Sequence, residues 1–178
     1  YCSIMAALLS SFAMRLRLKE QIKRILSQSK GKQSKFQSLL IVCSEEHLHK
    51  EELFLEFAKQ FGIAPISITV IVLSNKEILE TVETSIETHF FTKKSVGFFG
   101  KLPVSLKQLF KKKFDLQINF FNSSAVFTEF VSASFDSSLR VGFSKCNHQL
   151  NDLILDIDPN EGELFLKETN TYLKAILN

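Results

Sequence analysis

Three short apolar runs in the second half of the chain constrain its fold more than any other feature. They are DLQINFF, SLRVGFS and DLILDID, at Asp115–Phe121, Ser138–Ser144 and Asp152–Asp158. Each is hydrophobic at most positions and too short for a globular helix. Strands of a parallel sheet have this pattern, because helices cover both faces of the sheet and leave no polar side. The runs therefore predict buried parallel strands.

The rest of the chain alternates between strand and helix patterns. Further strands are expected at Phe36–Cys43, Ile66–Leu73 and His89–Thr92. Helical periodicity covers Glu45–Phe61, Val104–Lys113, Ser123–Ala133 and Glu161–Leu177, and a short helix is expected at Asn75–Glu80. Alternation of this kind predicts an α/β three-layer sandwich around a mainly parallel sheet, with Rossmann-like or flavodoxin-like topology.

Charge divides the chain into two parts. Residues 1–36 hold eight Lys or Arg and one acidic residue, a net charge of +7, whereas the other 142 residues hold 14 basic and 18 acidic ones, a net charge of −4. Apolar residues recur at helical spacing from Met14 to Gln28, namely Leu18, Ile22, Ile25 and Leu26. We therefore expect a basic amphipathic arm and linker over 1–36 and a single α/β domain over 37–178. Met14 is the expected natural start, so that residues 1–13 would not be native.

Composition favours an intracellular protein. The three cysteines, Cys2, Cys43 and Cys146, leave an odd thiol under any pairing, which favours a reducing compartment. The apolar stretch from Ile4 to Met14 is far shorter than the ~20 residues that span a bilayer. We expect a cytoplasmic protein without a transmembrane segment.

Nucleotide-binding motifs are absent from the sequence. The first expected strand leads into SEEHLHK, which has neither the glycines of a dinucleotide-binding loop nor those of a P-loop. Carboxylates at the start of the next helix would repel a phosphate placed there. We therefore expect no cofactor.

Three small groups of residues could carry chemistry. His47 and His49 diverge on a helix, so solvated positions at a helix start are a better interpretation than a metal site. Cys146 and His148 form a Cys-x-His pair in an expected loop, without a third group to orient them. Asp156 and Asp158, at the end of the last strand, could bind Mg²⁺, or could form a turn that caps the following helix. We expect no metal site and assign no catalytic residue.

Basic residues form the most distinctive polar pattern. The candidate residues for contact with an anionic partner are Arg15, Arg17, Lys23, Arg24, Lys93, Lys94, Lys101, Lys107, Lys111, Lys112 and Lys113. Phe90, Phe91, Phe98 and Phe99 interleave with the first lysines of the second group. Lysines beside exposed aromatic rings can hold a single strand through phosphate contacts and base stacking. A solvated helix face with buried Phe is the alternative interpretation.

The sequence HFFTKK, followed by FFGKLP, FDLQINFF, LRVGF, DLILDID and TYLKAIL, resembles an uncharacterised family of small Bacteroidota proteins, catalogued as a domain of unknown function. The resemblance covers about residues 14–178 and implies the α/β fold and a cytoplasmic setting. It implies no activity, and this chain has Asn119 where the family favours Asp. FDLQINFF and LRVGF also show a fainter similarity to the amino-terminal half of lipopolysaccharide heptosyltransferases.

These observations lead to one functional hypothesis and two alternatives. The leading hypothesis is a non-enzymatic binding protein that contacts RNA or a ribonucleoprotein through the basic arm and the lysine-rich surface. The arm could instead lie on an anionic membrane, with Leu18, Ile22, Ile25 and Leu26 in the lipid boundary. The third hypothesis is an enzyme that acts on a nucleotide sugar or a phosphorylated metabolite, with Asp156 and Asp158 as candidate residues.

Overall fold

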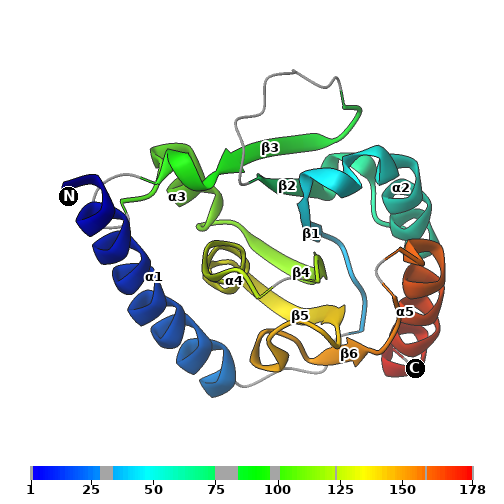
Figure 1. Ribbon diagram of the computed structural model, residues 1–178. Helices are drawn as coiled ribbons and strands as arrows, with labels where there is room; N and C mark the ends of the chain where they lie inside the picture. Colours follow the sequence, from blue (N-terminus) through cyan, green and yellow to red (C-terminus); the bar gives the residue numbers. More distant parts are fainter. Residues whose placement is uncertain are drawn as a thin grey trace.

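Six parallel strands form one sheet at the centre of the computed structural model, which describes residues 2–28, 34–74, 84–96, 101–122, 124–158 and 160–177 (Figure 1). Their order is β3-β2-β1-β4-β5-β6, and every neighbouring pair is parallel. The predicted α/β class and parallel sheet are confirmed, and the strand order is that of a Rossmann-like doubly wound sheet.

The strands are mostly apolar where helices cover both faces. Their bounds are β1 Leu39–Ser44, β2 Ile68–Ser74, β3 Glu87–Thr92, β4 Lys113–Phe120, β5 Asp136–Phe143 and β6 Leu153–Leu155. Every residue of β2, and all of β1 except its last, is buried. The edge strand β3 is mostly half-exposed. The predicted strand at Asp152–Asp158 is wrong over its second half, because β6 ends at Leu155 and the acidic residues follow it.

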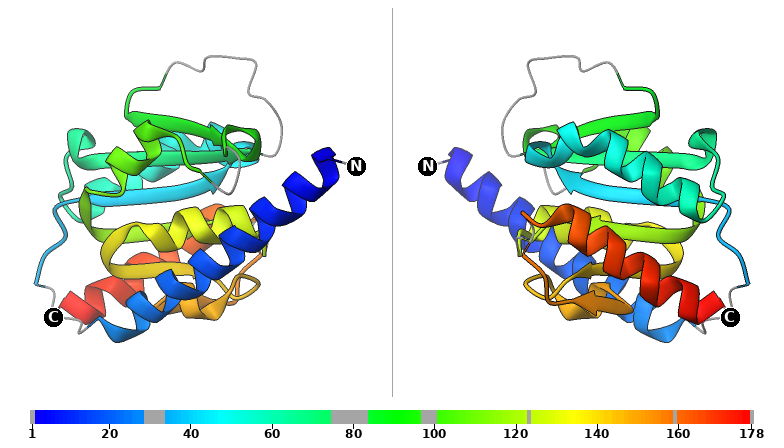
Figure 2. Two further views of the ribbon diagram at one scale, coloured as in Figure 1. Left: turned by 90° about the vertical axis from the view of Figure 1, so that its left-hand side faces the viewer. Right: turned by 90° about the vertical axis from the view of Figure 1, so that its right-hand side faces the viewer.

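Helices cover both faces of the sheet. Their bounds are α1 Cys2–Ser27, α2 Glu51–Gln60, α3 Val104–Leu109, α4 Val126–Ser134 and α5 Gly162–Leu177. In Figure 1, α1, α3 and α4 lie on one face of the sheet, and α2 and α5 lie on the other. Figure 2 shows α1 running along α4 in one view and α2 beside α5 in the other.

The helix predicted at Glu45–Phe61 is divided in two. A 3-10 helix, η1, covers Glu45–Lys50 and leads into α2. The predicted end of the helix is confirmed, because Gly62 has φ +69° and directs the chain back across the helix end. Its N–H donates to the Lys59 carbonyl at 3.0 Å, and that of Ile63 donates to the Ala58 carbonyl at 3.1 Å. Glycine adopts this left-handed conformation without steric strain, which explains why the helix stops there.

Helix α4 lies between the sheet and α1. Its sequence, VFTEFVSAS, is apolar or small at nearly every position, and seven of its nine residues are buried. A helix of that composition needs cover on more than one side. Met14, Leu18, Ile22 and Ile25 of α1 provide it and are themselves buried. The helix expected in a basic arm thus packs on the α/β layers. Of the segment that joins it to β1, the structure describes residues 34–38.

Other helix predictions differ from the structure at their ends. The helix expected at Val104–Lys113 ends at Leu109, because Lys113 already pairs with Asp136 in the sheet. The helix at Ser123–Ala133 begins three residues later, and that at Glu161–Leu177 is confirmed within one residue. The short helix expected at Asn75–Glu80 lies outside the described residues.

Candidate anion-binding surface

The outward side of α1 carries exposed basic residues at helical spacing. Arg15, Lys19 and Lys23 are separated by four residues each, so they lie along one side of the helix. All three are exposed, and no ion pair joins them to a carboxylate within the part of the chain that the structure describes. Lys19 was not among the sequence candidates, although its four-residue spacing from Arg15 and Lys23 was readable. Arg17 is also exposed.

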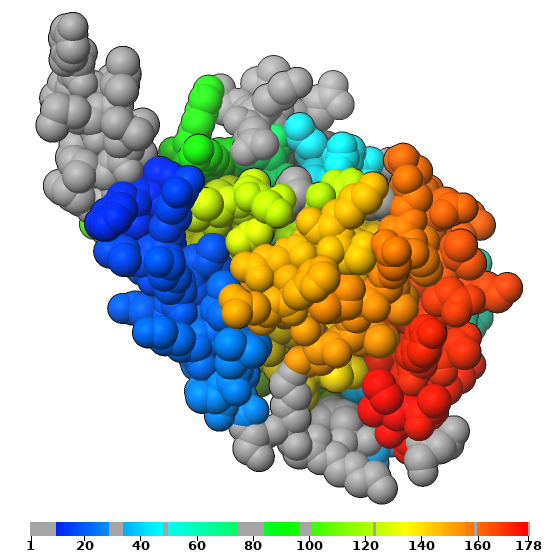
Figure 3. Space-filling model, turned by 60° about the horizontal axis from the view of Figure 1, so that its bottom comes forward, coloured from blue at the N-terminus to red at the C-terminus, as the bar shows by residue number. Residues whose placement is uncertain are grey.

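Arg24, one of the predicted contact residues, also has a structural role. Its Nη2 donates to the carbonyl oxygens of Ala133 and Phe135 at 3.0 and 3.1 Å. These carbonyls belong to the carboxyl end of α4, where a cation is favourable. Arg24 therefore helps to fix α1 on α4. In the space-filling view, α1 lies flush against the yellow and orange surface of the domain (Figure 3).

The lysines of the second candidate group do not form one cluster. Lys93 and Lys94 follow β3, at the carboxyl edge of the sheet, whereas Lys111, Lys112 and Lys113 precede or begin β4 at the amino edge. Strands of six residues separate the two edges by about 20 Å. Lys101 and Lys107 lie along the connection that crosses between them. All seven lysines are exposed, but the structure places them along the molecule rather than in one patch.

The aromatic residues interleaved with these lysines are only partly described. Phe91 is buried against the core and Phe90 is half-buried, whereas Phe98 and Phe99 lie outside the described residues. Phe91 cannot stack on a base without leaving the core. The predicted pairing of lysine with exposed aromatics is therefore wrong at Phe91.

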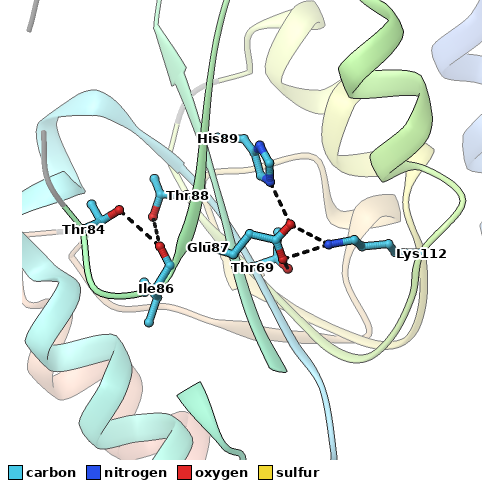
Figure 4. A network of polar contacts seen from close by, with 7 residues as sticks. All are labelled: Thr69, Thr84, Ile86, Glu87, Thr88, His89 and Lys112. Atoms are coloured by element: carbon cyan, nitrogen blue, oxygen red, sulfur yellow. Dashed lines mark hydrogen bonds and ion pairs between the residues drawn. The ribbon is translucent and has the colours of Figure 1, made fainter. Parts of the chain in front are cut away.

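Glu87 holds one of the candidate lysines at the amino edge of the sheet. Its carboxylate accepts hydrogen bonds from Lys112 Nζ at 2.6 and 2.8 Å, from Thr69 Oγ1 at 2.9 Å, and contacts His89 Nε2 at 2.9 Å (Figure 4). Partial burial raises the pKa of Glu87, but the hydrogen bonds from Lys112, His89 and Thr69 outweigh it and lower the pKa to about 2. Lys113 lies 3.7 Å from Asp136. Lys112 and Lys113 thus face carboxylates of their own chain.

Aromatic rings occupy part of the crevice where an open α/β sheet binds ligands. It would lie at the carboxyl ends of β1 and β4, which are neighbours although they are not consecutive in sequence. The Phe120 ring packs edge-on against His47, Phe54 and Phe165, with centroids 4.9 to 5.6 Å apart. A Cβ added at Gly162 would lie 2.9 Å from this ring, so the start of α5 closes on it. This packing agrees with the missing nucleotide motifs.

The remaining chemical candidates take up structural positions. The Asp158 carboxylate accepts from the Asn160 N–H at 2.9 Å, in the turn before α5, and Asp156 accepts from Ser144 Oγ at 2.5 Å. The two carboxylates thus accept from different partners, one in the turn and one after β5. The described residues contain no group of three His, Cys, Asp or Glu that could hold a metal ion. His47 is buried on Phe120, and the side chain of His49 is outside the described set.

The two described thiols are buried, which disfavours the thiolate form. Burial raises the pKa of Cys43 to about 12. Burial likewise raises that of Cys146 to about 11, even though the Phe143 backbone opposes the shift. Cys146 Sγ lies 2.6 Å from the Phe121 carbonyl oxygen, to which it donates, while His148 contacts the Ser144 carbonyl. The Cys-x-His pair is therefore directed at two different backbone groups.

A buried polar network was missed by the sequence analysis. Gln117 and Asn119 alternate along β4 and point to one face, where Ser132 of α4 meets them. Asn119 is fully buried, and its Nδ2 donates to Asn151 Oδ1 at 2.7 Å. The two polar residues at alternate positions of an apolar strand were the available signal. The side chain of Asn119 therefore lies in the core.

Comparisons with known proteins place the chain in a family. Among the described residues, no helix combines the length and hydropathy that a membrane span requires. No curated protein and no solved structure shows significant similarity to the chain, and the resemblance to heptosyltransferases finds no support there. A family model matches residues 12–176, which include most of α1 and the whole sheet. The chain therefore belongs to the family of unknown function DUF6913.

Proposed function

We propose that this protein is a non-enzymatic binding module whose basic α1 surface contacts RNA. The observation that carries the proposal is the row of Arg15, Lys19 and Lys23, exposed on a helix whose opposite side is fixed to the domain. A row of fixed cations attracts a phosphate backbone and releases its counterions. The missing nucleotide motifs and the aromatic packing around Phe120 favour this proposal over an enzyme of nucleotide sugars.

The membrane alternative has less support. It requires Leu18, Ile22 and Ile25 to enter a lipid boundary, but these residues are buried against α4. Only Leu26 of the four proposed anchors is exposed. Insertion of the other three would require α1 to leave the domain and to expose the apolar side of α4 as well.

Substitution tests the RNA proposal better than truncation, because removal of α1 would uncover α4. We suggest the variant R15S/K19S/K23S, with K59S/K167S/K174S as a control of equal charge change on the opposite face of the sheet. Binding of a fluorescein-labelled single-stranded RNA is measured by anisotropy over a range of salt concentrations. The α1 variant is expected to lose affinity and to lower the salt slope by roughly 2, since each lost phosphate contact lowers it by about 0.7.

Two outcomes would contradict the proposal. One is absence of RNA binding by the intact protein at low salt, and the other is equal binding by the two triple variants. A parallel flotation assay uses vesicles of anionic phospholipid. Binding to vesicles without binding to RNA would replace the proposal with the membrane alternative.

A further inference from the structure

The outward side of α1 also carries an unpartnered apolar stripe. Phe12, Leu16 and Leu26 are 62%, 48% and 62% exposed, although large apolar side chains are usually covered. Together with Lys19 and Lys23 they are spaced by four, three, four and three residues. This 3.5-residue period keeps a seam facing another helix along its whole length, as in coiled coils. The stripe therefore fits a helical partner.

The two lysines in the middle of the stripe restrict that partner. If the stripes of two copies faced each other, Lys19 and Lys23 would meet ammonium groups, which is unfavourable in a partly dry contact. The partner surface must therefore offer carboxylates opposite these lysines and apolar side chains on either side. Such a surface exists on the opposite face of the same molecule.

A groove runs between α2 and α5 on that face. It consists of two cavities of about 590 and 350 Å³ that share Leu53, Glu56 and Glu163 in their linings. Leu164, which is 40% exposed, extends the apolar lining, and Glu52 adds a third carboxylate. The linings also include Lys50, Lys167 and Glu161, so four glutamates face two lysines and the groove is net acidic. The two helices that carry it, α2 and α5, lie side by side in Figure 2.

The stripe and the groove agree in length and in charge. From Phe12 to Leu26 the stripe measures about 21 Å, and α5 measures about 24 Å. From this complementarity we infer that α1 of one copy docks in the α2/α5 groove of a second copy, with Lys19 and Lys23 beside the groove glutamates. The contact joins opposite faces of the molecule, so it is heterologous, and a pair of copies keeps one free groove on the first copy and one free stripe on the second. This inference goes beyond the proposed function and does not depend on it.

Sedimentation velocity of the nuclease-treated full chain tests the inference. Association should increase with protein concentration at low salt. It should decrease at high salt, because salt screens the attraction between the exposed lysines and glutamates. The groove variant E52K/E56K/E163K and the stripe variant L16S/K19S/K23S should each associate at least tenfold more weakly. The control K107S/K111S, which alters α3 and the residues after it, should associate like the wild type. Circular dichroism verifies that each variant is folded.

Mixing the two variants gives the sharpest result. The groove variant retains an intact stripe and the stripe variant retains an intact groove, so together they can form one contact only. A complex of one copy of each is expected, and it should not grow further. A wild type that stays monomeric at its highest soluble concentration would overturn the inference. Association unaltered by either variant, or a mixture without the 1:1 complex, would also overturn it, because the contact would then be elsewhere or isologous.

Self-association is measured without nucleic acid, so its outcome is independent of the RNA proposal. Self-association can fail while the α1 variant still loses RNA binding, and the reverse result is equally distinct. Since both contacts use Lys19 and Lys23, RNA and a second copy should compete for the same side of α1. Addition of RNA to an associated sample is therefore expected to dissociate it when both proposals hold.

Discussion

Arg24 and Arg140 donate hydrogen bonds to the same carbonyl oxygen, that of Phe135. The Nη2–O distances are 3.1 Å from Arg24 and 2.9 Å from Arg140, which also donates to the Ser137 carbonyl at 2.9 Å. Arg140 is fully buried in β5, whereas Arg24 reaches the site from α1. Burial lowers the pKa of Arg140 to about 10, with a further contribution from Arg24 that Asp136 opposes. Arg140 stays charged at neutral pH, so two cations hold the carboxyl end of α4.

Replacement of Arg24 by Met should weaken the attachment of α1. The variant keeps an apolar stem but loses two charge-assisted hydrogen bonds to the α4 carbonyls, which contribute about 1–2 kcal/mol on a partly exposed site. Urea unfolding followed by circular dichroism measures the loss. Lys23→Met is the matched control, because Lys23 is exposed at the preceding position of the same helix. It should change the stability by less than about 0.5 kcal/mol. Equal losses in both variants would show that the bonds of Arg24 contribute nothing specific.

The sheet was predictable because its signal is repeated along each strand. In DLQINFF or in Ile66–Leu73, every apolar side chain indicates the same buried environment. The ends of strands were less predictable, because only a few residues determine where a strand stops. Asp156 and Asp158 alternate with apolar residues as in a strand, but β6 pairs only with β5 and stops at Leu155, where the turn to α5 begins.

The position of α1 was not predictable from its own sequence. Met14, Leu18, Ile22 and Ile25 define an apolar side that could equally cover a protein surface or a membrane. The information that decides between these lies in α4, whose buried sequence VFTEFVSAS has no polar side for solvent. Likewise, helical spacing predicted that Arg24 projects from α1, but only the tertiary structure places it at the α4 carbonyls. Exposure and pairing of the candidate lysines are tertiary properties of the same kind.

Glu87 should contribute stability that is lost in acid. Its pKa is lowered in the folded protein to about 2 from an ordinary value of 4.5, so folding favours the carboxylate. The contribution is fully present above about pH 4.5 and disappears as the pH falls through about 2. Glu87→Gln should therefore be less stable than the wild type at neutral pH, and this difference should shrink as the pH falls below about 4.5. Solvent screening keeps the effect small, because Glu87 is exposed.

Thermal unfolding of wild type and variant across this pH range measures the effect. Lys112→Met removes the partner that donates both shortest hydrogen bonds, so its loss of stability should show the same dependence on pH. Glu45→Gln, at an exposed position in η1, is the control and should show little dependence. A stability difference between Glu87→Gln and wild type that persists unchanged below about pH 3 would contradict the lowered pKa.

Cys43 and Cys146 should resist alkylation in the native protein. The thiolate is the reactive form, and the pKa values of about 12 and 11 leave it scarce at neutral pH. Both side chains are also buried, Cys43 within β1 and Cys146 against Phe121. Peptide mapping after iodoacetamide treatment should find both unmodified in buffer and both modified in urea. Rapid native labelling of Cys146 would revive it as a nucleophile beside His148.

Asn119 should matter for stability more than an ordinary surface amide. Its Oδ1 accepts from Gln117 and Ser132 at 2.9 and 2.7 Å, and its Nδ2 donates to Asn151. Asn119→Ala leaves the Asn151 acceptor and the Ser132 hydroxyl without this partner in the core, which should cost about 2–4 kcal/mol. Asn122→Ala, at an exposed position just after β4, should cost less than about 0.5 kcal/mol. Urea unfolding compares the two variants. The result also shows whether Asn119 has a structural or a chemical role. A large loss of stability marks it as structural, since a polar residue kept for chemistry alone could be removed without weakening the fold.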